Sequence, residues 1–354
     1  MIEIEIRVTD YCNLSCKHCY AEAKNLGNQF PFEADFRYSK EYLESFIKKI
    51  FDFIEFYDRK ENEKSRVVQF MLMGGEPTLI GIKRFNMLLE MIHAEGSKRG
   101  YQVFVGTSTN GLLLNENWIS FYKEKAKLLS LAVAYDPFIR FRNSEEENRW
   151  WKSVDLLKRN SIEFSVNIAI TRYLLKFNLT EFISRLEIKS IDFAPFLPVG
   201  RGRYFAQELG VFSSELSDFY IKLLENFSDK IDLKSFKRIS YFLKNREIQN
   251  QFGTLNGWGA CWRRVIVDLN GNLFFECSYP NSLGNIFSVP LESIFLSSPF
   301  LFLLSKKLYR EFCLGCEYYN FCRGGCIALL PFEDINECVG LKKFLKYLEE
   351  KGNS

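Results

Sequence analysis

One short stretch near the start of the chain, Cys12-Asn-Leu-Ser-Cys16-Lys-His18-Cys19-Tyr20, holds three cysteines, separated by three residues and then by two. Three thiolates can bind three irons of a cubane [4Fe–4S] cluster. The fourth iron would then lack a protein ligand and stay open to another molecule, as the open position of a catalytic zinc site does. The spacing therefore predicts a cluster with a chemical role, in an enzyme that works through radicals.

The other cysteines also indicate metal binding. The chain has 10 cysteines, none of them lies between Cys19 and Cys261, and seven run from Cys261 to Cys338. Reducing compartments disfavour disulfides, so clustered cysteines there are more often metal ligands or catalytic groups. Only two histidines occur, His18 and His93, which argues against histidine-rich zinc, copper or iron sites.

Composition excludes several classes of protein. The 354 residues suffice for two or three domains, and a net charge of +3 is too small to indicate a nucleic-acid partner. The first residues, Met1 to Arg7, are acidic where a signal peptide is basic. The most apolar stretch, 291–304, is too short to cross a bilayer. We therefore expect a cytoplasmic protein without membrane or nucleic-acid partners.

The first two hundred residues alternate between strand and helix patterns. We predict strands at 2–8, 67–73, 101–108, 128–134, 162–170 and 188–196, with helices between them at 39–57, 83–98, 115–125, 145–158 and 179–186. Repeated βα units indicate a parallel sheet with right-handed crossovers. The predicted fold class is α/β, with a partial (β/α)6 barrel.

Three motifs follow three successive predicted strands. The cysteine triad follows the first strand, Gly74-Gly75-Glu76-Pro77 follows the second, and Thr109-Asn110-Gly111 follows the third. Functional loops of such barrels lie at the carboxyl ends of the strands. All three motifs are therefore predicted on one face.

The chain is predicted to have four parts. These are the barrel at 1–200, a bridging region at 201–256, a cysteine-organised domain at 257–340 and a C-terminal helix at 341–354. Within the cysteine-organised domain we predict a hairpin at 265–275, because Asn270-Gly271 suits a type I′ turn. The basic residues from Lys230 to Arg246 favour a solvated helix face over a docking surface for an acidic peptide.

Taken together, the triad, the Gly-Gly-Glu-Pro loop and the downstream cysteines resemble radical S-adenosylmethionine enzymes with a C-terminal iron–sulfur SPASM domain. The resemblance covers nearly the whole chain. It implies that the cluster on Cys12, Cys16 and Cys19 binds S-adenosylmethionine through its open iron. One electron would cleave the cofactor, and a 5′-deoxyadenosyl radical would take a hydrogen atom from the substrate.

The same resemblance implies cofactor contacts elsewhere. His18 stands where family members contact the adenine, and Tyr20 is expected at the cofactor with it. The alternative is that His18 is a plain polar residue of the loop. The loop that binds the methionyl amino group would be Gly74, Gly75, Glu76 and Pro77, and the ribose or carboxylate would lie near Ser108, Thr109 and Asn110. One departure is Ala134, two residues before Asp136, where the family often carries a serine. Pro198-Val-Gly200-Arg201 resembles a later motif that reaches the cofactor or the substrate.

The downstream cysteines resemble ligands of two auxiliary clusters. Cys313, Cys316, Cys322 and Cys338 would hold one [4Fe–4S] cluster completely, and Cys261, Cys277 and Cys326 would hold three irons of another. The chain would then carry three [4Fe–4S] clusters, one of the auxiliary ones with an open iron or a ligand other than cysteine. Zinc is the alternative for such cysteines, but seven fit one tetrahedral site poorly.

The resemblance leaves several functions open. Our first hypothesis is a maturase that oxidatively cross-links (C–C, C–S or C–O) residues of a ribosomally made precursor peptide. The alternative is an anaerobic sulfatase-maturing enzyme that oxidises Cys or Ser to formylglycine. A peptide epimerase is disfavoured because no thiol is left over, and a simple electron carrier because it needs no Gly-Gly-Glu-Pro loop. No side chain stands out as a catalytic acid or base, so the catalytic residues stay unknown.

Several partners follow from these hypotheses. The substrate would be a precursor peptide, and the electron would come from an external one-electron donor such as flavodoxin or ferredoxin. Only eleven residues precede Cys12, so no winged-helix domain is expected there to bind a leader peptide. The leader would bind elsewhere on the enzyme or on a separate leader-binding protein.

Overall fold

A computed structural model of the chain describes residues 2–26, 38–232, 264–275, 281–294, 313, 315–322, 338 and 341–352. The strands are β1 (Ile2–Arg7), β2 (Tyr11–Cys12), β3 (Lys24–Asn25), β4 (Val67–Met73), β5 (Gln102–Thr109), β6 (Leu129–Ala134), β7 (Ser165–Ile170), β8 (Ile191–Pro195), β9 (Arg264–Asp268), β10 (Asn272–Phe274) and β11 (Gly284–Asn285). The α-helices are α1 (Lys40–Glu61), α2 (Ile82–Lys98), α3 (Glu116–Lys125), α4 (Ser144–Arg159), α5 (Leu179–Leu186), α6 (Ala206–Leu209), α7 (Ser213–Phe227), α10 (Leu291–Ile294), α12 (Tyr319–Cys322) and α13 (Lys342–Gly352). Short 3-10 helices are η1 (Pro77–Ile80), η2 (Leu174–Lys176) and η3 (Gly200–Phe205).

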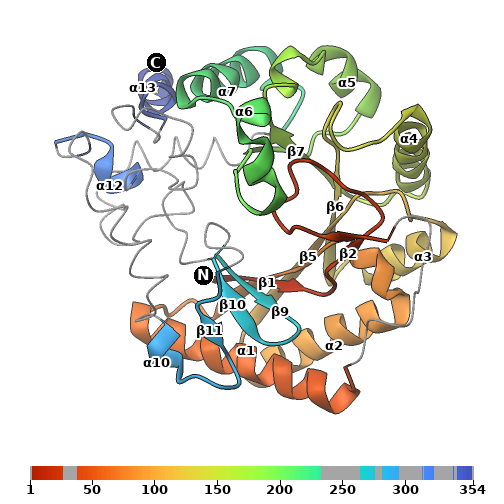
Figure 1. Cartoon of the computed structure of the whole chain (residues 1–354), viewed down its shortest axis with the longest axis vertical. Helices are drawn as coiled ribbons and strands as arrows, with labels where there is room; N and C mark the ends of the chain where they lie inside the picture. The colour runs from red at the N-terminus through yellow and green to blue at the C-terminus, as the bar shows by residue number, and fades with distance from the viewer. Residues whose placement is uncertain are drawn as a thin grey trace.

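One curved sheet organises the molecule. Its strand order is β11-β10-β9-β1-β4-β5-β6-β7-β8, and the six strands from β1 to β8 in this order are all parallel to their neighbours. Helices α1 to α5 surround the outside of these strands (Figure 1). The predicted α/β class and the six strands of the partial barrel are confirmed.

Side-chain alternation explains which face of each strand meets the helices. Ile2, Ile4 and Ile6 of β1 are all 0% exposed and belong to the core that the helices cover. Glu3 and Glu5 alternate with them and lie on the opposite, inner face, because successive strand residues point to opposite sides. The inner face of the barrel therefore carries charged groups close to where the site is built.

The helices begin where side chains can cap them. Ser39 accepts a hydrogen bond from the N–H of Tyr42 at the start of α1, and Asn115 and Asn143 accept from the first turns of α3 and α4. A side-chain oxygen at this position satisfies backbone N–H groups that the helix leaves unpaired. These caps place the helix starts within one residue of the predicted ones.

Some predicted boundaries differ from those in the structure. Ile162 was expected to open a strand, but its N–H donates to the carbonyl of Leu157, so it belongs to the turn that ends α4, and β7 begins at Ser165. Helix α1 extends beyond residue 57 and ends at Glu61, where Asn62 takes a left-handed conformation with φ +52°. Apolar periodicity locates elements but does not locate such ends.

The hairpin predicted at 265–275 joins the barrel sheet. Strand β9 pairs in parallel with β1, from Glu3 opposite Arg264 to Arg7 opposite Asp268. Its partner β10 is antiparallel to it. The predicted type I′ turn is wrong: only Gly271 has a positive φ, +88°, and its N–H donates to the carbonyl of Asp268 at 2.9 Å. This is a tight turn followed by a left-handed glycine, in which one position rather than two needs glycine.

The described C-terminal part adds α13, which packs on α7 through the rings of Phe344 and Tyr220, 5.3 Å apart. The bridging region from residue 233 onward lies outside the described residues. So do Cys261, Cys277 and Cys326. The domain boundaries stay predictions. In the described part of the chain, no helix is long and apolar enough to cross a membrane.

Candidate active site at the carboxyl ends of the strands

The cysteine triad occupies the loop that leaves β1. Cys12 lies in the short strand β2, opposite Asn25 of β3, and is 7% exposed, whereas Cys16 and Cys19 are half-buried. The N–H of Cys19 donates to the carbonyl of Cys16 at 3.2 Å, so the last two cysteines share one turn. The local pairing of β2 with β3 closes the loop and holds its three thiols at one edge of the sheet.

These thiols suit an iron–sulfur cluster. Burial, with the carboxylate of Glu76 nearby, raises the pKa of the Cys12 thiol, and burial raises that of Cys16 to about 11 although Arg140 opposes the shift. Thiolates in such a place need a strongly cationic partner, which clustered irons supply. The N–H of Leu14 lies 3.3 Å from the Sγ of Cys12, a contact typical of cluster ligands.

A single metal ion fits less well. Among the residues that the structure describes, no group of three or more His, Cys, Asp or Glu side chains is placed to hold one ion. Ligands of a cubane cluster bind different irons, so they need not converge on a single point. The donor set of the triad therefore matches the predicted cluster better than a mononuclear site.

The Gly-Gly-Glu-Pro loop is bound to the triad loop by its backbone. The N–H groups of Gly75 and Glu76 donate to the carbonyls of Thr9 and Tyr11, both at 2.8 Å. A Cβ on Gly75 would lie 2.0 Å from the carbonyl oxygen of Tyr11, and one on Gly74 would lie 2.4 Å from that of Thr9. Both glycines are therefore required by the close approach of two protein backbones.

The carboxylate of Glu76 is buried, 1% exposed, and holds loops together. Its Oε1 accepts hydrogen bonds from the N–H of Thr78 at 3.1 Å, the hydroxyl of Thr78 at 2.6 Å and the hydroxyl of Thr109 at 2.7 Å. Its Oε2 accepts from the N–H of Asn110 at 2.7 Å. Burial raises the pKa of Glu76, while these donors oppose the rise. Pro77 follows as the first residue of η1.

Asn110 links the third motif to the first. Its Nδ2 donates to the Oδ1 of Asn13 at 2.7 Å and lies 3.8 Å from the Sγ of Cys12. Its Oδ1 accepts from the N–H of Leu112 at 3.0 Å, which fixes the orientation of the amide. The motifs after β1, β4 and β5 thus meet at one edge, as predicted. Ser108 is half-buried and, by strand alternation, lies on the inner face of β5 beside Ala132 of β6.

His18 belongs to a buried charged cluster that sequence reasoning did not find. Its Nε2 lies 3.0 Å from the Oδ2 of Asp136 and 3.3 Å from an Nη of Arg140. Asp136 also accepts from Arg140 Nε at 2.7 Å and from the N–H of Ala169 at 2.6 Å. Burial alone would raise the pKa of Asp136, but Arg140 and His18 hold it well below its usual range. The only available signal was an aspartate two residues after the end of a predicted strand.

Tyr20 faces the inside of the barrel. Its hydroxyl donates to Glu5 of β1, and the other oxygen of Glu5 accepts from Arg264 of β9 at 3.1 Å. Tyr20, which the sequence predicts at the cofactor, therefore also joins the triad loop to β1 and β9.

The segment after β8 also reaches the triad loop. Gly200 has φ +56°, and a Cβ there would lie 2.0 Å from the carbonyl oxygen of Tyr20. The N–H of Arg201 donates to the carbonyl of Cys19 at 2.9 Å, and its guanidinium donates to that of Cys16 at 3.3 Å. The motif Pro198-Val-Gly200-Arg201, which follows the last strand in the sheet order, β8, thus supports the triad loop.

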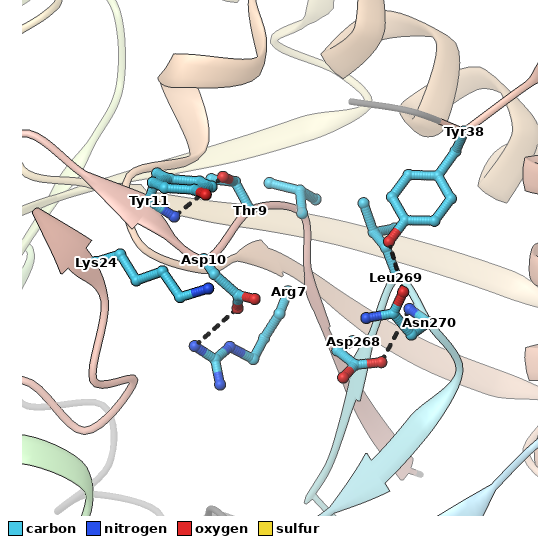
Figure 2. A pocket seen from close by; sticks show the side chains of 10 residues that line it. Arg7, Thr9, Asp10, Tyr11, Lys24, Tyr38, Asp268, Leu269 and Asn270 are labelled. Atoms are coloured by element: carbon cyan, nitrogen blue, oxygen red, sulfur yellow. Dashed lines mark hydrogen bonds and ion pairs between the residues drawn. The ribbon is translucent and has the colours of Figure 1, made fainter. Parts of the chain in front are cut away.

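A polar cavity of about 320 Å³ lies beside the triad loop, where β1 and β9 end (Figure 2). Arg7 and Asp10 lie together on one side of it and point toward each other, with an Nη–Oδ1 distance of 3.4 Å. Asp268 lies on the opposite side and accepts from the N–H of Asn270 at 2.9 Å. The lining also includes Val8, Thr9, Tyr11, Lys24, Tyr38 and Leu269. Asp268 is the one acidic residue of the cysteine-organised domain that lies here among those described.

The auxiliary cysteines are described only in part. The N–H of Cys316 donates to the carbonyl of Cys313 at 3.2 Å, so these two share a turn, and Cys322 ends α12 with 9% exposure. Cys338 is half-buried. The assignment of these cysteines and of Cys261, Cys277 and Cys326 to two clusters stays a prediction.

Comparison with known proteins identifies related sequences. Residues 6–175 match the Radical SAM superfamily. A cysteine-type anaerobic sulfatase-maturating enzyme of Clostridium perfringens is 24% identical over 361 residues, which cover 95% of this chain and 93% of the relative. A serine-type anaerobic sulfatase-maturating enzyme of Klebsiella pneumoniae is 20% identical, over 94% of this chain and 83% of the relative.

Solved structures share the fold. The structure described as native anSMEcpe with bound AdoMet superimposes with a TM-score of 0.70 at 19% identity and covers 100% of both chains. The same protein with AdoMet and a Cp18Cys peptide gives a TM-score of 0.68 at 19% identity, over 99% of this chain and 98% of that one. At this level of identity the likeness concerns the fold.

Proposed function

We propose that this protein, whose residues 6–175 match the Radical SAM superfamily, is a peptide- or protein-modifying enzyme of the anaerobic sulfatase-maturating type. It would oxidise a cysteine or serine side chain of its substrate to formylglycine. The observation that carries the proposal is the likeness to such enzymes over 95% of the chain, together with the meeting of three loop motifs at Cys12. Both cysteine-type and serine-type relatives match, so the choice between the two side chains stays part of the test.

The residues of the triad loop would hold the cluster. Cys12, Cys16 and Cys19 supply its three thiolates, and Asn110 directs an N–H toward the sulfur of Cys12. When bound, the cluster and S-adenosylmethionine together supply the 5′-deoxyadenosyl radical. The protein keeps the surrounding loops in place: Glu76 holds the ends of β4 and β5 together, and the buried pair of Asp136 and Arg140 supports the carboxyl end of β6.

The proposed reaction balances as a two-electron oxidation. A cysteine side chain, CH2–SH, reacts with water to give an aldehyde and hydrogen sulfide, with release of two electrons and two protons. A serine side chain, CH2–OH, gives the aldehyde directly, with the same release. The oxidant is S-adenosylmethionine, which ends as methionine and 5′-deoxyadenosine. The predicted auxiliary clusters would carry the second electron away from the substrate.

The comparisons favour this function over peptide cross-linking, our first hypothesis from the sequence. Cross-linking would use the same cluster, cofactor and barrel and would differ in its substrate. It is therefore kept as the competing outcome of the experiment below, with a precursor peptide encoded beside the gene as the competing substrate.

The experiment uses the full-length protein, reconstituted with iron and sulfide without oxygen and reduced with dithionite. It is supplied with S-adenosylmethionine and matched peptides that carry a sulfatase-type sequence with either Cys or Ser at the modified position. We expect 5′-deoxyadenosine and a peptide aldehyde that a hydrazide reagent captures. The Cys12→Ser variant is the matched control and should form neither product.

Other outcomes decide between the alternatives. Cofactor cleavage with no captured aldehyde, together with loss of two hydrogens from a neighbouring precursor peptide, would replace sulfatase-type oxidation by cross-linking. Absence of 5′-deoxyadenosine with every peptide would remove both functions.

A further inference from the structure

Arg201, in η3, binds the triad loop with both its backbone and its side chain. Its N–H donates to the carbonyl oxygen of Cys19 at 2.9 Å. Its guanidinium donates to the carbonyl oxygen of Cys16 at 3.3 Å and, through its other Nη, to that of Ala23 near the end of the loop. In Figure 1 the red triad loop passes beside the green segment that ends in α6. One residue thus binds the main chain of two proposed cluster ligands.

The partners of this guanidinium are neutral carbonyl groups, whereas the charged side chains beside it are paired. Arg203 pairs with the carboxylate of Glu22 at 2.9 Å, and Lys17 pairs with that of Glu208 at 2.7 Å. In the described part of the chain, no acidic side chain forms an ion pair with Arg201, which is half-buried. The triad loop therefore meets one positive charge that no described carboxylate neutralises.

Two other arginines reach the triad loop, but each lies beside a carboxylate. The Nε of Arg140 donates to Asp136 at 2.7 Å. An Nη of Arg7 lies 3.4 Å from the Oδ1 of Asp10. Of these three guanidinium groups, that of Arg201 is the one whose charge is not balanced by a described carboxylate.

This charge lies close to the sulfur atoms of the triad. The carbonyl oxygen of a cysteine is four bonds from its own sulfur, so the guanidinium of Arg201 lies within roughly 9 Å of the Sγ of Cys16. Exposed charges interact over about 8 Å at physiological ionic strength, and half-buried charges are screened less. The side chain of Arg201 is therefore close enough to act electrostatically on a cluster bound there.

We propose that Arg201 is a positioning residue for the predicted cluster: its charge raises the reduction potential, and its fork of N–H groups holds the turn from Cys16 to Cys19. Thiolate ligands make such a cluster negative, and the electron that reduces it adds to that charge. A fixed cation stabilises the more negative state, so it favours reduction. The electron comes from the reductant, which is oxidised by one electron, and no bond forms or breaks. The inference rests on the predicted cluster and not on which side chain the enzyme oxidises.

The test separates the charge of Arg201 from its hydrogen bonds. Arg201→Gln removes the charge and keeps one amide N–H2 group, whereas Arg201→Lys keeps the charge but loses the planar fork. The matched control is Arg203→Gln, which removes the same charge from the same segment at an exposed position. Each full-length protein is reconstituted without oxygen, its iron content is measured, and it is titrated with dithionite under electron paramagnetic resonance. The triad cluster is recognised as the signal that changes when S-adenosylmethionine is added.

We expect Arg201→Gln to shift the reduction equilibrium of the triad cluster about tenfold toward the oxidised form, a change of about 59 mV to a more negative potential. Arg201→Lys should keep the potential of the original protein, because its charge remains. Both variants should retain less iron than the original, because the turn from Cys16 to Cys19 loses a carbonyl contact. Arg203→Gln should change neither measurement.

Three results would overturn the proposal. The first is an unchanged potential in Arg201→Gln. The second is an equal shift in Arg203→Gln, which would make the shift an effect of total charge. The third is an equal shift in Arg201→Lys, which would assign the potential to the hydrogen bonds alone.

A further variant covers the loss of the cluster itself. If Arg201→Gln takes up too little of the triad cluster to titrate, Arg201→Met takes its place, with the same expected shift. Loss of the cluster from every Arg201 variant would reduce the role of Arg201 to folding of the loop and would overturn its effect on the potential. The titration needs no peptide, so its result is independent of whether the enzyme forms an aldehyde.

Discussion

The Nδ2 of Asn110 lies 3.8 Å from the Sγ of Cys12, although the two residues are 98 positions apart in the chain. Asn110 is 4% exposed, and its amide is oriented by Asn13 and Leu112. An N–H directed at a cluster sulfur stabilises negative charge there and shifts the reduction potential of the cluster. This contact also joins the end of β5 to the start of the triad loop.

Replacing this amide tests the relationship. For Asn110→Ala we expect cofactor cleavage to fall about 10–100-fold, the usual cost of losing a partner of a metal ligand. The reduction potential of the cluster should also become more negative, which is measured by electron paramagnetic resonance during a redox titration. Asn86→Ala, at a half-buried position of α2, is the control. An unchanged potential would show that the Asn110 amide does not act on the cluster.

The glycine before Glu76 tests the backbone contact between loops. In Gly75→Ala the new methyl group would lie 2.0 Å from the carbonyl oxygen of Tyr11, so the loops must separate. We expect a stability loss of about 1–3 kcal/mol, the usual cost of overpacking, and a lower iron content after reconstitution. Gly100→Ala is the control for iron content only: its φ of +72° makes alanine costly there too, but a Cβ meets nothing within 4 Å and the position lies far from the triad in the sequence. Equal iron contents in the two variants would contradict the expectation.

Glu76 tests whether a buried carboxylate organises the site. In Glu76→Gln an amide N–H2 would replace one oxygen and face a hydrogen-bond donor, whichever way the amide turns. We expect the free energy of unfolding to fall by about 1–3 kcal/mol, because a buried donor is left unsatisfied. Chemical denaturation of the anaerobic protein measures this loss, and Glu90→Gln, which is exposed, should change stability little. A Glu76→Gln protein as stable as the original would argue against four simultaneous hydrogen bonds.

Asp136 tests the buried charged cluster behind the triad loop. Asp136→Asn keeps the shape of the side chain but leaves the guanidinium of Arg140 without its counter-ion. Breaking a buried ion pair on one side usually costs about 3–5 kcal/mol, so we expect a loss of this size in chemical denaturation. The exposed Asp155→Asn should be neutral. If Asp136→Asn and Asp155→Asn unfold at the same denaturant concentration, the ion pair does not contribute to stability.

Much of the fold could be predicted because its signals are local. The run Val67–Met73 is a strand in the prediction and in the structure, with the same two ends. The helix Leu179–Leu186 likewise begins and ends where it was predicted. Apolar spacing and turn residues act over a few positions, so they can be recognised without knowing the neighbours of an element in space.

Other features depend on neighbours in space. The pairing of β9 with β1 joins Arg264 to Glu3 and Glu5, and nothing in the local sequence of either strand specifies it. The pattern likewise indicates a turn at Asn270-Gly271 but not that Gly271 alone would be left-handed. Asp136 and Arg140 carry no helix or strand signal that distinguishes them from surface residues, although they form the buried cluster around His18.

The sequence by itself determined the spacing of Cys12, Cys16 and Cys19 and the order of strands and helices that places three motifs on one edge. Only the tertiary structure decided which side chains meet there. The reason is physical: spacing and periodicity act along the chain, whereas the contacts of Asn110 with Cys12 and of Glu76 with Thr109 form only when distant strands pack side by side.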